Sequence, residues 1–337
     1  MRQTFHSDCF RRRLLALLIA ALSFAIPAAA SAQTALEDLV SAVVRIKTFI
    51  NPDGSSVSNL GREREGTGVV IDESGLVLTI GYLMVEAHAA QIVTTSGRTL
   101  PASVVGYDHV TGFGLLRTLE PPKIKPLPLG KSADVKENDP LLVAGAGGAG
   151  AVLPVRVASR RVFAGSWEYL VENAIFTSPP HPAWSGAALI NREGKLVGVG
   201  SLIVSDAKAE GVASPGNMFV PIDLLPPIMG DLLSNGRVAG PGRPWLGVNA
   251  QATDGKLVVG RVAPESPAGK AGLKRGDVIT GIGGVKTNTL VEFYQRMWAT
   301  GDAGVTVPLD LESGGGSRRL NVPSVNRLDT LKLQSTF

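Results

Sequence analysis

The sequence predicts a mainly β protein that ends in a separate, small α+β domain. Its 337 residues include 40 glycines and 22 prolines but only 5% aromatic residues, a composition rich in turn formers. Between Gly66 and Ile228, short apolar runs alternate with turn signals, as where Val69–Ile71 is followed by Asp72–Gly75. Short strands with such frequent turns predict an antiparallel sandwich or barrel. After a Gly- and Pro-rich stretch at 234–244, the order of the patterns changes to mixed strands and helices.

Residues 1–32 are predicted to be a signal peptide. Arg11–Arg13 form a positive n-region, Leu14–Ile26 is an apolar run too short to cross a bilayer, and Ala30–Ala32 has the small-x-small cleavage pattern. The mature chain would begin just after Ala32, in the periplasm and without a membrane anchor. The arginines fit either general secretory or twin-arginine export.

Removal of this segment changes the charge and the chemistry that we expect. The segment carries four arginines and one aspartate, so the mature chain has 29 basic and 28 acidic residues and a net charge of +1. No basic stripe remains that would favour nucleic acid as a partner. Cys9, the one cysteine, also lies in the segment, and the histidines are scattered. We therefore predict no metal site and no cofactor.

One glycine-rich motif does not predict a dinucleotide-binding site. Gly145–Gly150 reads G-x-G-x-x-G, but a dinucleotide site needs a helix after it. The following residues, Ala151–Val157, predict extended chain. We interpret the motif as a loop of the β domain.

The order of elements gives the predicted domains. The β domain spans 33–235, with helices predicted at Ala35–Val43 and Leu83–Ala90. Residues 236–243 form the linker, a second domain spans 244–327, and 328–337 form a loose tail. The elements predicted in the second domain are the strands Lys256–Val262 and Asp277–Gly281, the short helix Pro267–Gly272, the helix Leu290–Ala299, and final strands.

The second domain resembles a PDZ domain of the bacterial, permuted kind. The resemblance rests on Pro244–Val248, Ala263–Leu273 and Lys274–Ile279, which occur in the expected order. It implies that peptides or protein C-termini bind as an added strand, with the terminal carboxylate held by backbone N–H groups. The residues implied in carboxylate capture are Trp245, Leu246, Gly247 and Val248. The candidates for the apolar wall are Leu290, Phe293, Tyr294 and Met297, some of which would instead be core.

The β domain resembles the HtrA/Deg family of trypsin-like proteases over about Leu36–Leu233. The matching stretches are Gly66–Asp72, Val104–Asp108, Leu115-Leu116, Ser185–Asn191, Gly194–Val199 and Val220–Asp223. The resemblance implies a chymotrypsin/trypsin-like double β-barrel, and a trailing PDZ domain is the family's usual arrangement. It also implies a homo-oligomer, by default a trimer.

The family's catalytic residues carry over only in part. Ser185 stands at the nucleophile position, in Ala183-Trp184-Ser185-Gly186. Tyr82 replaces the histidine of the Thr-x-x-His pattern, and Gly112 replaces the aspartate. Ala183 replaces the glycine whose N–H group helps to form the oxyanion hole. A serine needs a neighbouring base to become a nucleophile, and a neutral tyrosine does not supply one.

The remaining histidines offer no obvious replacement base. We expect His181 to lie on a surface loop, His88 to lie on a helix turned away from the cleft, and His109 to sit in a solvated turn beside Asp108. We therefore predict an exported HtrA-like pseudoprotease that binds peptides, with a scaffolding or quality-control role. The alternatives are a weakly active or unconventional serine endopeptidase and a chaperone-like holder of unfolded chains.

Overall fold

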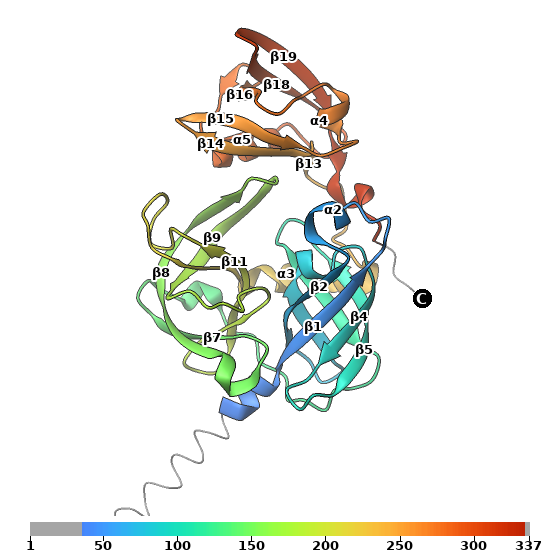
Figure 1. The fold of residues 1–337 in the computed structure, drawn as a ribbon, viewed down its shortest axis with the longest axis vertical. Coiled ribbons are helices and arrows are strands. Elements are labelled where there is room, and N and C mark those ends of the chain that lie inside the picture. Colours follow the sequence, from blue (N-terminus) through green and yellow to red (C-terminus); the bar gives the residue numbers. More distant parts are fainter. Residues whose placement is uncertain (1–35, 334–337) are drawn as a thin grey trace, which may run out of the picture.

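The structure confirms a mainly β fold with two barrels followed by a PDZ domain (Figure 1). It is a computed structural model that describes residues 36–333. The predicted signal peptide and the cleavage pattern near Ala32 lie outside the described residues.

The first barrel closes in the order β1-β2-β3-β6-β5-β4. Every neighbouring pair is antiparallel, so the backbone groups of each strand are satisfied by both neighbours. Its strands are β1 Val43–Ile50, β2 Glu63–Val70, β3 Leu76–Ile80, β4 Ala87–Val93, β5 Thr99–Tyr107 and β6 Phe113–Thr118, with the helix α2 Val57–Leu60 and the 3-10 turn η1 Gly81–Leu83 between strands.

The second barrel closes in the order β10-β11-β12-β9-β8-β7. Its strands are β7 Pro140–Ala144, β8 Val152–Gly165, β9 Tyr169–Ser178, β10 Ala188–Ile190, β11 Leu196–Val204 and β12 Gly216–Pro221. The 3-10 turns η2 Ser132–Asp134, η3 Gly148–Ala151 and η4 Ile222–Leu224 lie in its connections. The G-x-G-x-x-G stretch runs through η3 into the strand β8, as the loop interpretation predicts.

The helix α3, Pro226–Asn235, leads from the second barrel to the PDZ domain and ends at Gly236 in a left-handed conformation. The PDZ domain has the strands β13 Pro244–Trp245, β14 Val248–Thr253, β15 Lys256–Val262, β16 Val278–Ile282, β17 Val285–Lys286, β18 Thr306–Ser313, β19 Gly316–Pro323 and β20 Val325–Asn326. Its helices are α4 Pro267–Lys270 and α5 Leu290–Trp298, and the 3-10 turn η5 Arg327–Thr330 follows.

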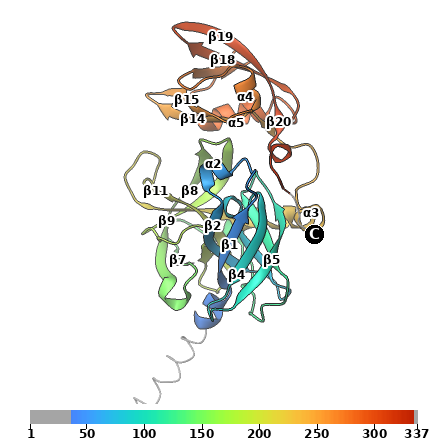
Figure 2. The same ribbon diagram turned by 45° about the vertical axis from the view of Figure 1, so that its right-hand side comes forward.

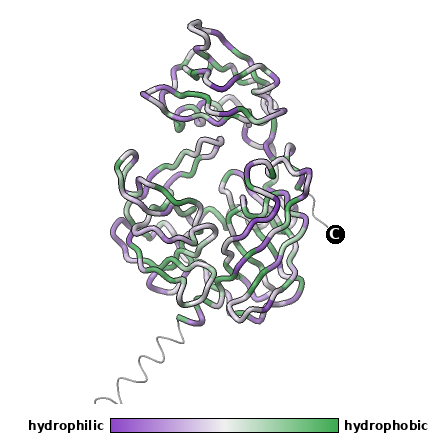
Figure 3. The backbone as a smooth tube through the Cα atoms, in the orientation of Figure 1, coloured by the Kyte–Doolittle hydropathy of each residue, from purple (hydrophilic) through white to green (hydrophobic). Residues whose placement is uncertain are grey.

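Apolar side chains on the inner faces of the strands form the cores. Figure 3 shows hydrophobic stretches along the strands of both barrels and of the PDZ sheet. One buried cluster contains residues of both barrels, including Ile46 and Leu78 of the first and Ala188 and Leu196 of the second. The two barrels therefore share apolar contacts, and the cleft lies where they meet.

The helix predicted at Leu83–Ala90 is wrong. Strand β4 begins at Ala87 and pairs with β1 and β5, and only the short turn η1 precedes it. Glu86 has a φ of 63°, which interrupts any helix at that point. Helix propensity is a small local preference even for alanine, the strongest helix former, so strand pairing within the closed barrel overrides it. The helix predicted at Ala35–Val43 is shorter in the structure. Among the described residues it spans 36–41, and Val43 already belongs to the strand β1.

The β8–β9 hairpin leaves the second barrel and reaches the PDZ domain. In Figures 1 and 2 the green hairpin rises toward β14 and α5. Contacts of α5 with both strands of the hairpin agree with this view. The hairpin is thus a part of the first domain that contacts α5 of the PDZ domain.

Candidate functional site

Ser185 lies in the loop between β9 and β10, at the junction of the barrels. Its carbonyl accepts a hydrogen bond of 2.9 Å from the N–H group of Thr67 on β2. The next residue, Gly186, has a φ of 76°, and a Cβ there would overlap the carbonyl of Thr67. Only glycine fits this close approach, so the loop keeps the serine half-buried at the mouth of the cleft.

Tyr82 is the hydrogen-bond partner of Ser185. The tyrosine lies on η1, where Arg64 Nη1 donates to its carbonyl at 2.7 Å. Its hydroxyl donates to the carbonyl of Ser201 at 2.8 Å and lies 2.8 Å from Ser185 Oγ. Because the single phenol proton goes to Ser201, Ser185 Oγ donates to the tyrosine oxygen. Burial raises the pKa of Tyr82 far above its ordinary value, against the opposing effect of the Ser185 hydrogen bond.

The position of Gly112 has no room for an aspartate. Gly112 has a φ of 80°, and a Cβ on it would lie 2.9 Å from the hydroxyl of Tyr169. That hydroxyl donates to the carbonyl of Thr111 at 2.7 Å and is buried. A tyrosine from the hairpin therefore fills the space above the glycine.

His181 is buried, so its prediction as a surface histidine is wrong. Its exposed fraction is 4%, and its N–H group donates to Asn217 Oδ1. Ring Nε2 lies 3.1 Å from the carbonyl of Ala151, while Nδ1 accepts from the N–H group of Ala183 at 3.0 Å. The ring is therefore neutral with its proton on Nε2, and burial lowers its pKa. The backbone N–H group of Ala183, which the family resemblance puts at the oxyanion position, therefore points to this ring.

The other two histidines also depart from expectation. His88 is exposed, but it lies on strand β4 and not on a helix. His109 is not in a solvated turn, because Asp108 beside it is buried and accepts from both the N–H group and the hydroxyl of Thr111. His109 Nδ1 lies 3.0 Å from the hydroxyl of Tyr107, and burial lowers the pKa of His109 to about 3. Within residues 36–333 Ser185 Oγ pairs with a tyrosine and with none of the three histidines.

The predicted carboxylate-binding N–H groups of the PDZ domain converge on one carboxylate. Leu246 N–H donates to Glu168 Oε2 at 2.9 Å. Gly247 and Val248 N–H groups donate to Glu168 Oε1 at 2.6 Å each. Gly247 has a φ of 84°, and a Cβ there would overlap Ser266. The loop is thus shaped by glycine to present three donors in one direction.

Glu168 lies at the tip of the β8–β9 hairpin and is buried. Burial raises its pKa to about 7, while the N–H donors of the PDZ loop and the charge of Arg327 oppose the rise. In the same turn, the carbonyl of Ser166 accepts from the N–H group of Ala250 on β14 at 3.1 Å. The hydroxyl of Tyr294 on α5 donates to the carbonyl of Gly165 at 2.7 Å.

The side chains proposed for the apolar wall lie on α5. Phe293 and Met297 are completely buried in the PDZ core cluster, which includes Leu170 of the hairpin. Leu290 is partly buried at its edge, and Trp245 of β13 stacks against the guanidinium of Arg327 at 4.4 Å. The hairpin therefore packs on the same face of the domain as these residues.

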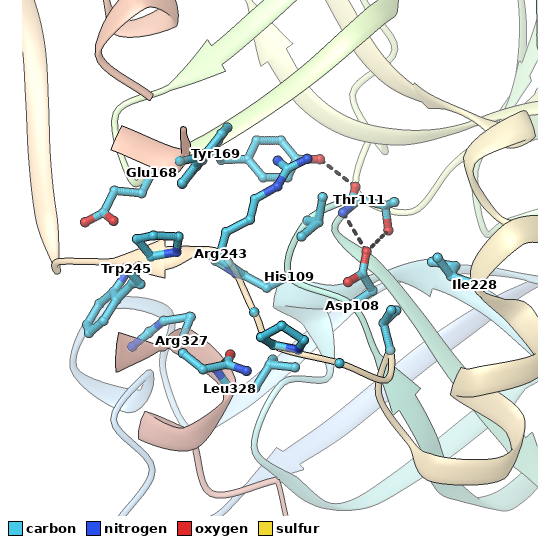
Figure 4. Close-up of a pocket in the computed structure, with 18 of the residues that line it drawn as sticks. Asp108, His109, Thr111, Glu168, Tyr169, Ile228, Arg243, Trp245, Arg327 and Leu328 are labelled. Carbon is cyan, nitrogen blue, oxygen red and sulfur yellow. Dashed lines mark hydrogen bonds between the residues drawn. The ribbon is translucent and has the colours of Figure 1, made fainter. Parts of the chain in front are cut away.

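A cavity of about 300 Å³ lies beside Glu168, between the two domains (Figure 4). Arg243 stacks on Trp298 at 4.5 Å, and Arg327 lies close to the cavity as well. In the figure Tyr169 reaches across to Thr111, which is bonded to Asp108. Two carboxylates, Asp108 and Glu168, and two guanidinium groups thus line this cavity together with apolar side chains.

Two residues of the candidate site were missed by sequence reasoning. Glu168 and Tyr169 occupy the PDZ loop and the space above Gly112, yet neither belongs to a motif that predicts such a role. Glu168 is 78–80 residues away from the N–H groups that it binds. The turn at 165–168 signals only a hairpin, so its partner could not be found without the tertiary structure.

Within residues 36–333 no group of three or more His, Cys, Asp or Glu side chains could hold a metal ion. In the same range no helix is long and apolar enough to span a bilayer.

Comparison with known proteins agrees with this architecture. The model of the trypsin-like peptidase domain matches residues 66–199, and that of the PDZ domain matches 244–323. The serine protease Do-like HtrA of Bacillus subtilis is 27% identical over 322 residues, which cover 83% of this chain and 69% of the relative. The periplasmic pH-dependent serine endoprotease DegQ of Escherichia coli is 28% identical over 266 residues, 74% of this chain and 57% of the relative.

The structural likeness extends over most of the chain. The solved structure of the HtrA-type protease AlgW with decapeptide has a TM-score of 0.52 and 22% sequence identity. It covers 87% of this chain and 98% of that chain. At this identity the likeness establishes the fold alone.

Proposed function

We propose that this chain, which has a trypsin-like peptidase domain followed by a PDZ domain, is a member of the HtrA/Deg family and an exported pseudoprotease that binds peptides or protein C-termini. The observation that carries the proposal is the partner of Ser185. Its hydroxyl proton is directed to the oxygen of Tyr82, whose own proton is committed to the Ser201 carbonyl. The serine is hydrogen-bonded, but its partner is no base.

The chemistry of this pair argues against acyl transfer. A neutral phenol oxygen is a poor proton acceptor, and the raised pKa of Tyr82 keeps the phenol neutral across the physiological range. Loss of the histidine in a serine protease costs on the order of a millionfold in kcat. The Ala183 N–H group is directed to His181, and loss of one oxyanion donor costs a further ~10²–10³-fold.

PDZ binding is the activity that we propose in its place. The N–H groups of Leu246, Gly247 and Val248 already hold a carboxylate, which supports capture of a peptide's C-terminus by the same loop. The strand β14 would pair with the peptide, and Leu290, Phe293 and Met297 would set a preference for an apolar last residue. For so short a groove we expect a Kd that is roughly micromolar.

A weakly active or unconventional serine endopeptidase is the second candidate. The comparisons favour it, because the relatives are named as serine proteases and Ser185 is retained. It would require a base other than Tyr82 to approach the serine. A chaperone-like holder of unfolded chains is a third possibility that uses the same fold without catalysis.

Turnover separates the first two candidates. Purified mature protein should not hydrolyse unfolded casein and should not label with a fluorophosphonate probe at Ser185. The matched control is Ser185→Ala. A casein signal that disappears in Ser185→Ala would establish the endopeptidase and refute the pseudoprotease, whereas equal signals in both would point to a contaminant.

Location and assembly follow as further proposals. We expect the mature chain in the periplasm, where the relative DegQ is placed by its name. We also expect a homotrimer formed by the trypsin-like domain. N-terminal sequencing of protein from a periplasmic extract, and sedimentation velocity of that protein, test these two proposals. An intact Met1 on cytoplasmic protein would contradict the first, and a monomer would contradict the second.

A further inference from the structure

We propose that the turn at residues 165–169 is an intramolecular ligand of the PDZ groove, in which the side-chain carboxylate of Glu168 takes the place of a peptide's terminal carboxylate. The groove is then closed to outside peptides until this turn is displaced. This inference deepens the proposed function and rests on it, because it names what regulates peptide binding.

The carboxylate of Glu168 makes the contacts that a terminal carboxylate would make. Both oxygens are used, Oε2 with Leu246 N–H at 2.9 Å and Oε1 with Gly247 and Val248 N–H at 2.6 Å each. A set of three backbone donors can serve one carboxylate at a time, so Glu168 and a peptide exclude each other.

The backbone of the turn also imitates a bound strand. Two residues before Glu168, the carbonyl of Ser166 accepts from the N–H group of Ala250. Ala250 lies on β14, the strand that begins in the carboxylate loop, Leu246–Val248. A peptide that adds a strand to a sheet edge is held by main-chain bonds of this type. The turn therefore combines both parts of PDZ recognition, the carboxylate and the added strand.

The opposite side of the groove holds the turn as well. Tyr294 on α5 donates its hydroxyl to the carbonyl of Gly165 at 2.7 Å and accepts from the N–H group of Glu168 at 3.1 Å. Tyr294 and Glu168 are both buried, and Leu170 belongs to the PDZ core cluster. Contacts from β14, α5 and the carboxylate loop thus converge on residues within the short segment 165–170.

The backbone conformation of Glu168 indicates that its contact with the carboxylate loop is specific. Its φ of 60° lies in the left-handed region, which is unfavourable for a residue with a long side chain. The surrounding bonds hold it there and direct the carboxylate into the loop. A tethered ligand also acts at an effective concentration in the millimolar range, which a peptide of micromolar affinity must overcome.

The test compares the full mature chain with three variants. Glu168→Ala removes the carboxylate, and Glu168→Gln retains the shape without the charge. Glu172→Ala is the matched control, because Glu172 is an exposed glutamate on the same hairpin. The first readout is hydrogen exchange at the amides of Leu246, Gly247 and Val248. The second is binding of a decapeptide library with apolar last residues, as free acids and as C-terminal amides.

We expect the three amides to be protected in the unaltered chain and in Glu172→Ala, less protected in Glu168→Gln, and unprotected in Glu168→Ala. Free-acid peptides should bind Glu168→Ala at least about tenfold more tightly than the unaltered chain, since removal of the resident ligand raises the competent fraction. Amides that exchange equally in all four proteins would overturn the inference. Lost protection with unchanged peptide affinity would overturn it too.

Failure of the proposed function would look different. If protection is lost in Glu168→Ala but no free-acid peptide binds any of the four proteins, peptide binding is refuted while the internal contact is supported. If free acids and amides bind equally, carboxylate capture from outside is refuted, and the internal contact is again judged by the exchange data alone.

Discussion

At the scale of single residues, the cleft is defined by the hydroxyl group of Tyr82. This group donates to the carbonyl of Ser201 and accepts from Ser185, so it joins three segments of the two barrels in a partly buried place. A hydroxyl in this arrangement stabilises the fold, whether or not any reaction occurs. The role of Tyr82 can therefore be tested through stability.

We expect Tyr82→Phe to destabilise the protein by about 0.5–1.5 kcal/mol, because two partly buried polar groups, Ser185 Oγ and the Ser201 carbonyl, lose a partner. Urea unfolding of the mature chain and the variant measures this difference. Ser185→Ala serves as the control and should cost less, since the tyrosine retains its bond to Ser201. A Tyr82→Phe variant that loses measurable proteolysis, with stability unchanged, would give Tyr82 a catalytic role instead.

Gly112 shows why the triad is not restored by two substitutions. We expect Gly112→Asp to destabilise the fold by about 1–3 kcal/mol, since its φ of 80° strains a residue with a side chain and the new Cβ would meet the Tyr169 hydroxyl. Added to Tyr82→His, it should not produce casein turnover, because the N–H group of Ala183 remains directed to His181.

The comparison is made by thermal or urea unfolding and a casein assay. Gly112→Asp combined with Tyr169→Phe should recover part of the lost stability, because the clashing oxygen is gone. Robust turnover in the Tyr82→His, Gly112→Asp double variant would mean that the oxyanion donors are better placed than the structure indicates.

At the scale of elements, the β8–β9 hairpin connects the two domains through hydrogen bonds and a buried carboxyl group, that of Glu168. Burial raises the pKa of Glu168 to about 7 in the docked hairpin, from an ordinary value near 4.5. Between these two pKa values, docking of the hairpin onto the PDZ domain is therefore accompanied by protonation of Glu168. It is strongest at acid pH and weakens as the pH rises through about 7. His109 nearby stays neutral across this range, because burial lowers its pKa to about 3.

We therefore expect the affinity for a free-acid peptide to increase as the pH rises from 5.5 to 8. The peptide's own terminal carboxylate is ionised throughout this range. Fluorescence anisotropy at several pH values measures the trend. Glu168→Gln should show a flat profile, and a flat profile in the unaltered chain would show that Glu168 does not titrate on docking.

At the scale of the whole molecule, the position of the PDZ domain depends on few contacts outside the linker. The turn at 165–169 supplies a compact group of them, and the chain end supplies another, where the N–H group of Lys332 donates to Glu86 of the first barrel. This contact and η5 place part of the predicted tail against the trypsin-like domain. Relative motion of the domains is expected once the turn is released.

We expect Glu168→Ala to increase proteolytic cleavage within 236–243 by an added protease, because the linker is covered less when the domains separate. Limited trypsin digestion, followed by mass spectrometry, measures the rate of cleavage after Arg237, since the bond between Arg243 and Pro244 is not a trypsin site. Glu172→Ala should behave as the unaltered chain does. Equal cleavage in all three proteins would mean that other contacts keep the domains together.

The sequence by itself determined the architectures of the two domains. Turn-rich β patterns, glycine motifs and the order of segments are local signals, so the double barrel and the PDZ domain could be predicted, with the strand Lys256–Val262 placed at its observed bounds. The sequence also predicts that Tyr82 and Gly112 stand at the family's histidine and aspartate positions. Only the tertiary structure decided the partners of these residues. Strand pairing overrode the helix at Leu83–Ala90, and the carboxylate of Glu168 met N–H groups almost 80 residues away, because long-range contacts depend on how closed barrels pack and not on local pattern.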